Sequence, residues 1–177
     1  MEQAVNLSRR RFFRAQTGNS HAIRPPWSVA EQTFFSLCQR CDDCVKACET
    51  GLLKRGDGGY PEADFNRGEC TFCQQCVEAC QHEALLYSPD SQPWRIKAAI
   101  KDSCLARNGI HCRTCAERCD LEAITFRLMP GGIAQPTLDT EACTGCGACV
   151  ADCPSRSITM NNEQQTHDSG TQNHGSC

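Results

Sequence analysis

The chain has 177 residues, a formal net charge of −3 and 17 cysteines, close to one residue in ten. A cysteine content this high is typical of small domains that are held together by disulfides or metals and lack a large apolar core. The mild acidity gives no support to a nucleic-acid partner, and no apolar run approaches the roughly 18 residues of a membrane-spanning helix. We therefore expect a soluble protein without a transmembrane segment that needs its cysteines to fold.

The N-terminal segment, residues 1–30, is basic, because five arginines oppose one acidic residue. Its residues 8–14 resemble a twin-arginine export motif, but polar residues follow where such a signal requires an apolar region. We interpret Arg9, Arg10 and Arg11 as a partner-binding or membrane-surface segment. A working export signal and a solvated tail without a role are the alternatives.

Two prolines and a tryptophan end this segment. Pro25 and Pro26 favour an extended conformation, because proline lacks a backbone donor and restricts the residue before it. Trp27 follows them directly. We expect its ring to pack on apolar surface near the first cysteines, with a docking anchor for a partner as the alternative.

Sixteen of the cysteines form four runs of four. Three runs share the spacing CxxCxxCxxxC, which holds [4Fe–4S] clusters in bacterial ferredoxins, and the third run keeps only the second half of it. The runs are Cys38, Cys41, Cys44 and Cys48; Cys70, Cys73, Cys76 and Cys80; Cys104, Cys112, Cys115 and Cys119; and Cys143, Cys146, Cys149 and Cys153. Iron–sulfur clusters are favoured over zinc, whose structural sites usually separate two CxxC pairs by a long insert, and over disulfides, which require an oxidising compartment.

The fourth cysteine of a run ligates the other cluster in two-cluster ferredoxins. Applied to this chain, that exchange predicts four crossed ligand sets. They are Cys38, Cys41, Cys44 and Cys80; Cys70, Cys73, Cys76 and Cys48; Cys104, Cys112, Cys115 and Cys153; and Cys143, Cys146, Cys149 and Cys119.

The third run is irregular, because residues 105–111 lengthen its first gap. Its cluster could be labile or of a different nuclearity. His111 and His82 adjoin cysteines and are candidate ligands or hydrogen-bond donors, although surface histidines are the more common case. Cys177 lies outside every run and is expected to be a free thiol.

The first cysteines of the runs follow one another at 32, 34 and 39 residues, which indicates a repeated unit. We expect each unit to comprise a strand, a cysteine loop, a short helix with the last cysteines, and a return strand. The predicted fold is α+β, with tandem bacterial-type two-[4Fe–4S] ferredoxin-like modules, a flexible basic N-terminal arm and a disordered C-terminal tail. The predicted boundaries are 1–30 for the arm, 33–88 for the first module, 89–95 for a linker, 96–161 for the second module and 162–177 for the tail.

Glycines at residues 56–59 and 130–132 predict one tight turn within each module. The chain shows no Gly-rich nucleotide loop, no Ser/His/Asp set and no flavin fingerprint, so we expect no enzyme activity.

Motifs besides the cysteines resemble those of the NapF family, the ferredoxin-type accessory proteins of periplasmic nitrate reductase systems. The likeness covers residues 7–160, including the stretched third run; the polar tail and Cys177 lie outside it. Its other motifs are Ser8 to Arg10, Ile23 to Trp27, Gly58 to Pro61 and Gly131 to Pro136.

The resemblance implies a cytoplasmic iron–sulfur protein that binds the catalytic subunit of periplasmic nitrate reductase and assists its maturation before export, by cluster or redox adjustment. It also implies three [4Fe–4S] clusters on the regular runs and leaves a fourth, on the Cys104 run, open. A soluble polyferredoxin electron carrier and a scaffold stabilised by clusters without a redox role are the alternatives.

Overall fold

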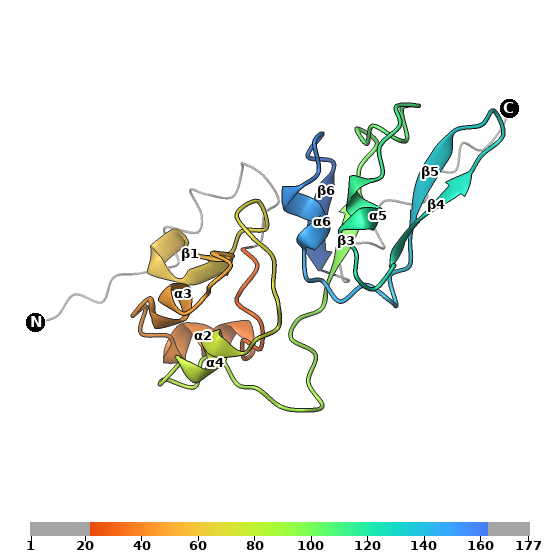
Figure 1. Ribbon diagram of the computed structural model, residues 1–177. Helices are drawn as coiled ribbons and strands as arrows, with labels where there is room; N and C mark the ends of the chain where they lie inside the picture. The colour runs from red at the N-terminus through yellow and green to blue at the C-terminus, as the bar shows by residue number, and fades with distance from the viewer. Residues whose placement is uncertain (1–21, 163–177) are drawn as a thin grey trace, which may run out of the picture.

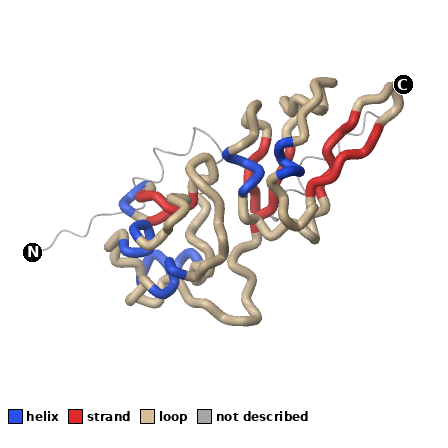
Figure 2. Tube along the Cα trace, viewed as in Figure 1, coloured by secondary structure: helices blue, strands red, loops and turns tan. Residues whose placement is uncertain are grey.

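The computed structural model describes residues 22–162. Its helices and strands are short and separated by long loops, as Figure 2 shows. In chain order the elements are α2 (Glu31–Leu37), α3 (Asp43–Lys46), β1 (Leu53–Arg55), the 3-10 turn η1 (Asp57–Gly59), β2 (Pro61–Ala63), α4 (Gln75–Glu78), β3 (Ile96–Ile100), α5 (Thr114–Glu117), β4 (Ile124–Leu128), β5 (Ala134–Leu138), α6 (Ala148–Ala151) and β6 (Ile158–Asn162). This mixture of helices and strands confirms the expected α+β class. None of the helices in residues 22–162 has the length and apolar character needed to cross a bilayer.

The same strand pairing occurs in both halves of the chain. In the second half, β4 and β5 form an antiparallel hairpin, and β3 pairs with β6 from the other end of the half. In the first half, β1 and β2 form the hairpin, while the outer pair is reduced to a single bridge between Ser28 and Leu85. Figure 1 shows the two halves as neighbouring bodies connected by an extended segment between α4 and β3.

Both hairpins turn at glycine pairs. Gly58 and Gly59 have φ angles of 66° and 82°, and Gly131 and Gly132 have φ angles of 94° and 80°. These values lie in the left-handed region, which glycine enters without the steric cost of a Cβ. The two predicted turns are therefore confirmed.

Each run of cysteines carries a four-residue helix, and α3 packs against α4 as α5 packs against α6. The residue before the helix is left-handed in the three regular runs, at Asp42, Gln74 and Gly147, with φ angles of 64°, 64° and 81°. Arg113, at the equivalent place in the third run, has a φ angle of −133°. The irregular run therefore also differs in backbone conformation.

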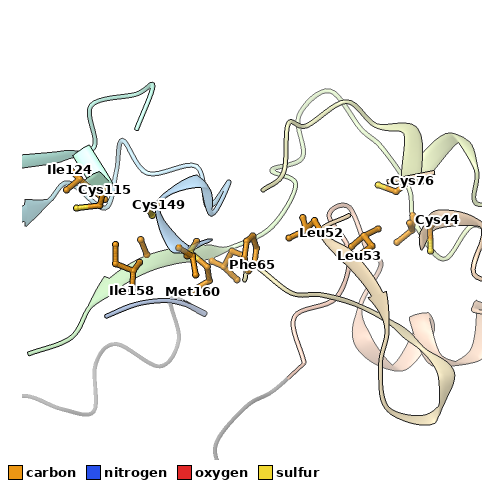
Figure 3. Packing of buried hydrophobic residues seen from close by; sticks show 14 of the residues in the cluster. Cys44, Leu52, Leu53, Phe65, Cys76, Cys115, Ile124, Cys149, Ile158 and Met160 are labelled. Atoms are coloured by element: carbon orange, nitrogen blue, oxygen red, sulfur yellow. The ribbon is translucent and has the colours of Figure 1, made fainter. Parts of the chain in front are cut away.

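The buried core extends through both halves. Phe34 and Leu52 are almost completely buried in the first half, as are Ile158 and Met160 in the second. Figure 3 shows Phe65 between Leu52 and Met160, so its ring connects the two groups. The third cysteine of every run belongs to this core: Cys44, Cys76, Cys115 and Cys149. Sulfur thus occupies part of the interior that larger apolar side chains fill in other proteins.

The described part of the predicted arm contacts the first half. The backbone N–H of Ala63 donates a hydrogen bond of 2.7 Å to the carbonyl oxygen of Ile23, and the guanidinium of Arg24 stacks on Phe35 at 4.9 Å. Trp27 is 7% exposed, which confirms that its ring packs. The flexible arm stays a prediction, since Arg9, Arg10 and Arg11 lie outside the described residues.

The predicted linker, residues 89–95, also contacts its surroundings. The ring of Trp94 packs edge-on against that of Phe65, with 5.5 Å between centroids, and the carbonyl oxygen of Pro93 accepts a hydrogen bond of 2.6 Å from Trp27. Strand β6 extends to Asn162, one residue beyond the predicted end of the second module. The other predicted boundaries remain hypotheses, and the rest of the tail, including Cys177, lies outside the described residues.

Candidate metal centres

Two hollows in the first half are each lined by four cysteines. One, of about 350 Å³ including open solvent, is lined by the sulfur-bearing residues Cys38, Cys41, Cys44 and Cys80. The other, of about 390 Å³ including open solvent, is lined by Cys48, Cys70, Cys73 and Cys76. Each set takes three cysteines from one run and the fourth from the other run. This placement agrees with the crossed exchange and not with four consecutive cysteines around one site.

In the second half, the third run faces the last cysteine of the fourth run. Burial raises the pKa of Cys115, and the nearby thiols of Cys104, Cys112 and Cys153 raise it further. Burial likewise raises the pKa of Cys149, and the nearby thiols of Cys146, Cys143 and Cys115 add to this shift. The first of these groups is the predicted crossed set, whereas the place of Cys119 in the second stays a prediction.

The buried thiols of the cysteine runs are weak acids as long as they carry no metal. Burial, reinforced by neighbouring thiols such as Cys80 and Cys38, raises the pKa of Cys44 to about 12. Burial raises the pKa of Cys149 to about 12 and that of Cys115 to about 11 for the same reason. Converging buried thiolates would repel one another. A soft cation that displaces the protons removes this repulsion, and thiolates are the preferred ligands of iron–sulfur clusters.

The donor set around each hollow suits an iron–sulfur cluster, because it offers four thiols. The four irons of a cube each take one thiolate, so the sulfurs around a cube stand farther apart than those around one zinc ion. All sixteen cysteines of the runs are free of disulfides. The donor set and its spacing therefore fit a [4Fe–4S] cluster.

The cysteines that line each hollow differ in their exposure to solvent. Cys41 and Cys73, the second cysteines of their runs, are exposed, whereas Cys44 and Cys76 are buried. Each hollow thus has one cysteine at the surface and one in the core. His82 lines the first hollow but is itself exposed.

Three of the cysteine sulfurs have a hydroxyl group beside them, and none of these hydroxyls was predicted from the sequence. Each belongs to the residue two positions after a cysteine. The pairs are Thr50 with Cys48 at 3.5 Å, Thr114 with Cys112 at 3.8 Å, and Ser155 with Cys153 at 3.7 Å. Hydrogen bonds to cluster sulfurs change the reduction potential. The recurring CxS or CxT pattern was the available signal.

The lengthened gap of the third run forms a compact loop. The side-chain amide of Asn108 donates hydrogen bonds to the carbonyl oxygens of Asp102, at 2.7 Å, and Cys104, at 2.8 Å. Arg107 also pairs with Asp102 at 2.9 Å. These contacts close the loop on itself, so Cys104 is held in place despite the longer gap. His111 is exposed beside this loop.

Comparison with known proteins also indicates iron–sulfur clusters. A family model described as a 4Fe-4S dicluster domain matches residues 37–84 and 109–167. The ferredoxin-type protein NapF of Haemophilus influenzae is 47% identical over 171 residues, covering 90% of this chain and 97% of that protein. NapF of Escherichia coli K12 is 46% identical over 141 residues, covering 79% of this chain and 85% of that protein.

A more distant relative carries a different name. The methylamine utilization ferredoxin-type protein MauM of Methylobacillus flagellatus is 32% identical over 150 residues, covering 74% of this chain and 63% of that protein. Similarity to the NapF proteins is both higher and more extensive. The chain therefore belongs to the 4Fe-4S dicluster domain family and, within it, to the NapF-type ferredoxins, which are iron–sulfur proteins.

Proposed function

We propose that this chain binds the catalytic subunit of periplasmic nitrate reductase in the cytoplasm and assists its maturation before export. Maturation here means adjustment of the iron–sulfur cluster or redox state of that subunit. The proposal assigns no substrate chemistry to the chain itself. The observation that carries it is similarity to NapF over 90% of the chain, a share too large to reflect the cysteine runs alone.

The metal ligands of this proposal are the sixteen cysteines of the four runs in their crossed sets. When bound, [4Fe–4S] clusters supply one-electron oxidation and reduction. The residues of the chain hold them: Cys44 and Cys76 reach the hollows from the buried faces of α3 and α4. Cys41 and Cys73 are exposed, which would let a partner's redox centre come close to the two hollows.

The arginine segment is the proposed contact with the partner. A triple variant, Arg9→Gln, Arg10→Gln and Arg11→Gln, should lose most of its capture of the unexported catalytic subunit from cytoplasm. Arg95→Gln, Arg127→Gln and Arg156→Gln, combined, make the matched control, because they remove three positive charges from exposed positions elsewhere. Equal capture by both triple variants and the wild type would remove the segment from the proposal. No capture by any of them would contradict the binding role.

A soluble electron carrier is the second candidate, and exposure of Cys41 and Cys73 favours it. A carrier exchanges electrons rapidly and forms little stable complex. Rapid oxidation of the reduced protein by a redox partner, without stable capture of the catalytic subunit, would support this candidate over the first.

A further inference from the structure

Two cysteine loops from different halves of the chain are joined by a backbone hydrogen bond. The N–H of Cys70 donates to the carbonyl oxygen of Cys146 at 2.8 Å. Cys70 belongs to the set around the second hollow, and Cys146 belongs to the fourth run. The bond therefore connects the backbone of two predicted ligand sets that the sequence analysis assigned to separate modules.

An ion-pair bridge lies on the same boundary. Arg118 Nη2 lies 3.3 Å from Glu69 Oε2, and Arg118 Nε lies 2.6 Å from Asp152 Oδ2. Glu69 precedes Cys70 in the first half, while Asp152 precedes the last cysteine of the second half. One guanidinium thus links the first half to the fourth run.

The boundary also contains a close packing contact. A Cβ at Gly147 would overlap the ring of Phe65. That ring is 5% exposed and packs against Trp94, so it has little room to move away. Gly147 directly follows Cys146, and Phe65 lies five residues before Cys70. The lack of a side chain at Gly147 therefore lets the two loops approach. We call the following group the seam: Phe65, Glu69, Cys70, Arg118, Cys146 and Gly147.

We propose that the seam couples the two halves into one electron path, between the set Cys48, Cys70, Cys73 and Cys76 and the set Cys119, Cys143, Cys146 and Cys149. Phe65, Arg118 and Gly147 are positioning residues in this path, because they set how closely the ligand loops approach. The inference rests on the proposed function in that it assumes cluster binding by these cysteines.

The transfer is the movement of one electron. With clusters bound, one cysteine set would hold the donor, which loses one electron, and the other set would hold the acceptor, which gains that electron. Dithionite supplies the electrons in the experiment, so no further reactant is needed.

The experiment measures electron spin relaxation in the full chain, loaded with clusters and reduced with dithionite. In Gly147→Ala, the added Cβ separates the loops, so the magnetic interaction between the halves weakens and relaxation becomes severalfold slower. Gly132→Ala is the matched control, because Gly132 has the same left-handed backbone, with a φ of 80° against 81°, but no atom near its missing Cβ. The double variant Phe65→Ala with Gly147→Ala removes the overlapping ring and should recover part of the wild-type relaxation.

The iron and sulfide contents of each variant distinguish failure of the seam proposal from failure of the proposed function. Gly147→Ala protein with wild-type iron and wild-type relaxation would overturn the seam and leave the proposed function intact. A wild-type chain without iron would overturn both. Should Gly147→Ala fail to load, Arg118→Gln serves instead, because that side chain is 48% exposed and its loss removes only the ion-pair bridge. Unchanged relaxation in Arg118→Gln with full iron would then contradict the proposal.

Discussion

The backbone N–H of Ser157 donates a hydrogen bond of 3.3 Å to the sulfur of Cys153. Ser157 is fully buried, and its hydroxyl donates to Ser155 Oγ at 2.8 Å. Ser155 Oγ therefore accepts one hydrogen bond and has its own proton free for Cys153 Sγ, 3.7 Å away. The sulfur of Cys153 thus faces two polar donors.

Replacing Ser155 with alanine should lower the reduction potential of the cluster held by Cys153. The hydroxyl stabilises the more negative, reduced state, so its loss disfavours reduction by about 20–60 mV, the equivalent of roughly 0.5–1.5 kcal/mol. A potentiometric titration followed by electron paramagnetic resonance measures the change. Ser36→Ala is the control, since its hydroxyl bonds only the exposed carbonyl of Thr33. Equal potentials in both variants would remove this role from Ser155.

The crossed exchange predicts which pairs of cysteine substitutions remove iron from the same cluster site. Cys80→Ser combined with Cys38→Ser should lose the same iron as either single variant, because both cysteines line one hollow. Cys80→Ser combined with Cys70→Ser should lose twice as much, because these cysteines line different hollows. Iron and acid-labile sulfide are counted after anaerobic purification. The opposite pattern would show that each run holds its own cluster.

Removal of the metal should unfold the chain. The core contains the cysteines of all four short helices, and metal binding contributes to folding when no site exists in the unfolded state. Chelation of the iron under reducing conditions should abolish the cooperative thermal transition seen by circular dichroism. A metal-free chain that still melts cooperatively near the temperature of the loaded form would contradict this prediction.

Iron retention should weaken as the pH falls. Burial raises the pKa of Cys44 to about 12 and that of Cys115 to about 11, so a thiolate that loses its iron takes up a proton throughout the range below those values. Loss of iron to a chelator should therefore be faster at about pH 6 than at about pH 8. The absorbance of the clusters reports the rate. A rate independent of pH would indicate that the release of iron does not involve protonation of the cysteines.

The sequence was most informative where the structure is local. The spacing of Cys143, Cys146 and Cys149 predicted a cysteine loop leading into a short helix, which is α6. The glycines at residues 56–59 and 130–132 predicted the two hairpin turns, because a left-handed backbone is a property of a few adjacent residues. Hydroxyls two positions after a cysteine were equally visible but were overlooked.

By itself, the sequence determined the iron–sulfur chemistry and the repeated unit, because the number and spacing of the cysteines decide what a short loop binds. The tertiary structure places together, in the first half, the crossed cysteine sets that the spacing predicted, and it alone decided that Cys70 meets Cys146 across the seam. The physical reason is that such contacts join residues far apart in the chain. Their geometry depends on the packing of Phe65 against Gly147 and on the ion pairs of Arg118, which no local spacing encodes.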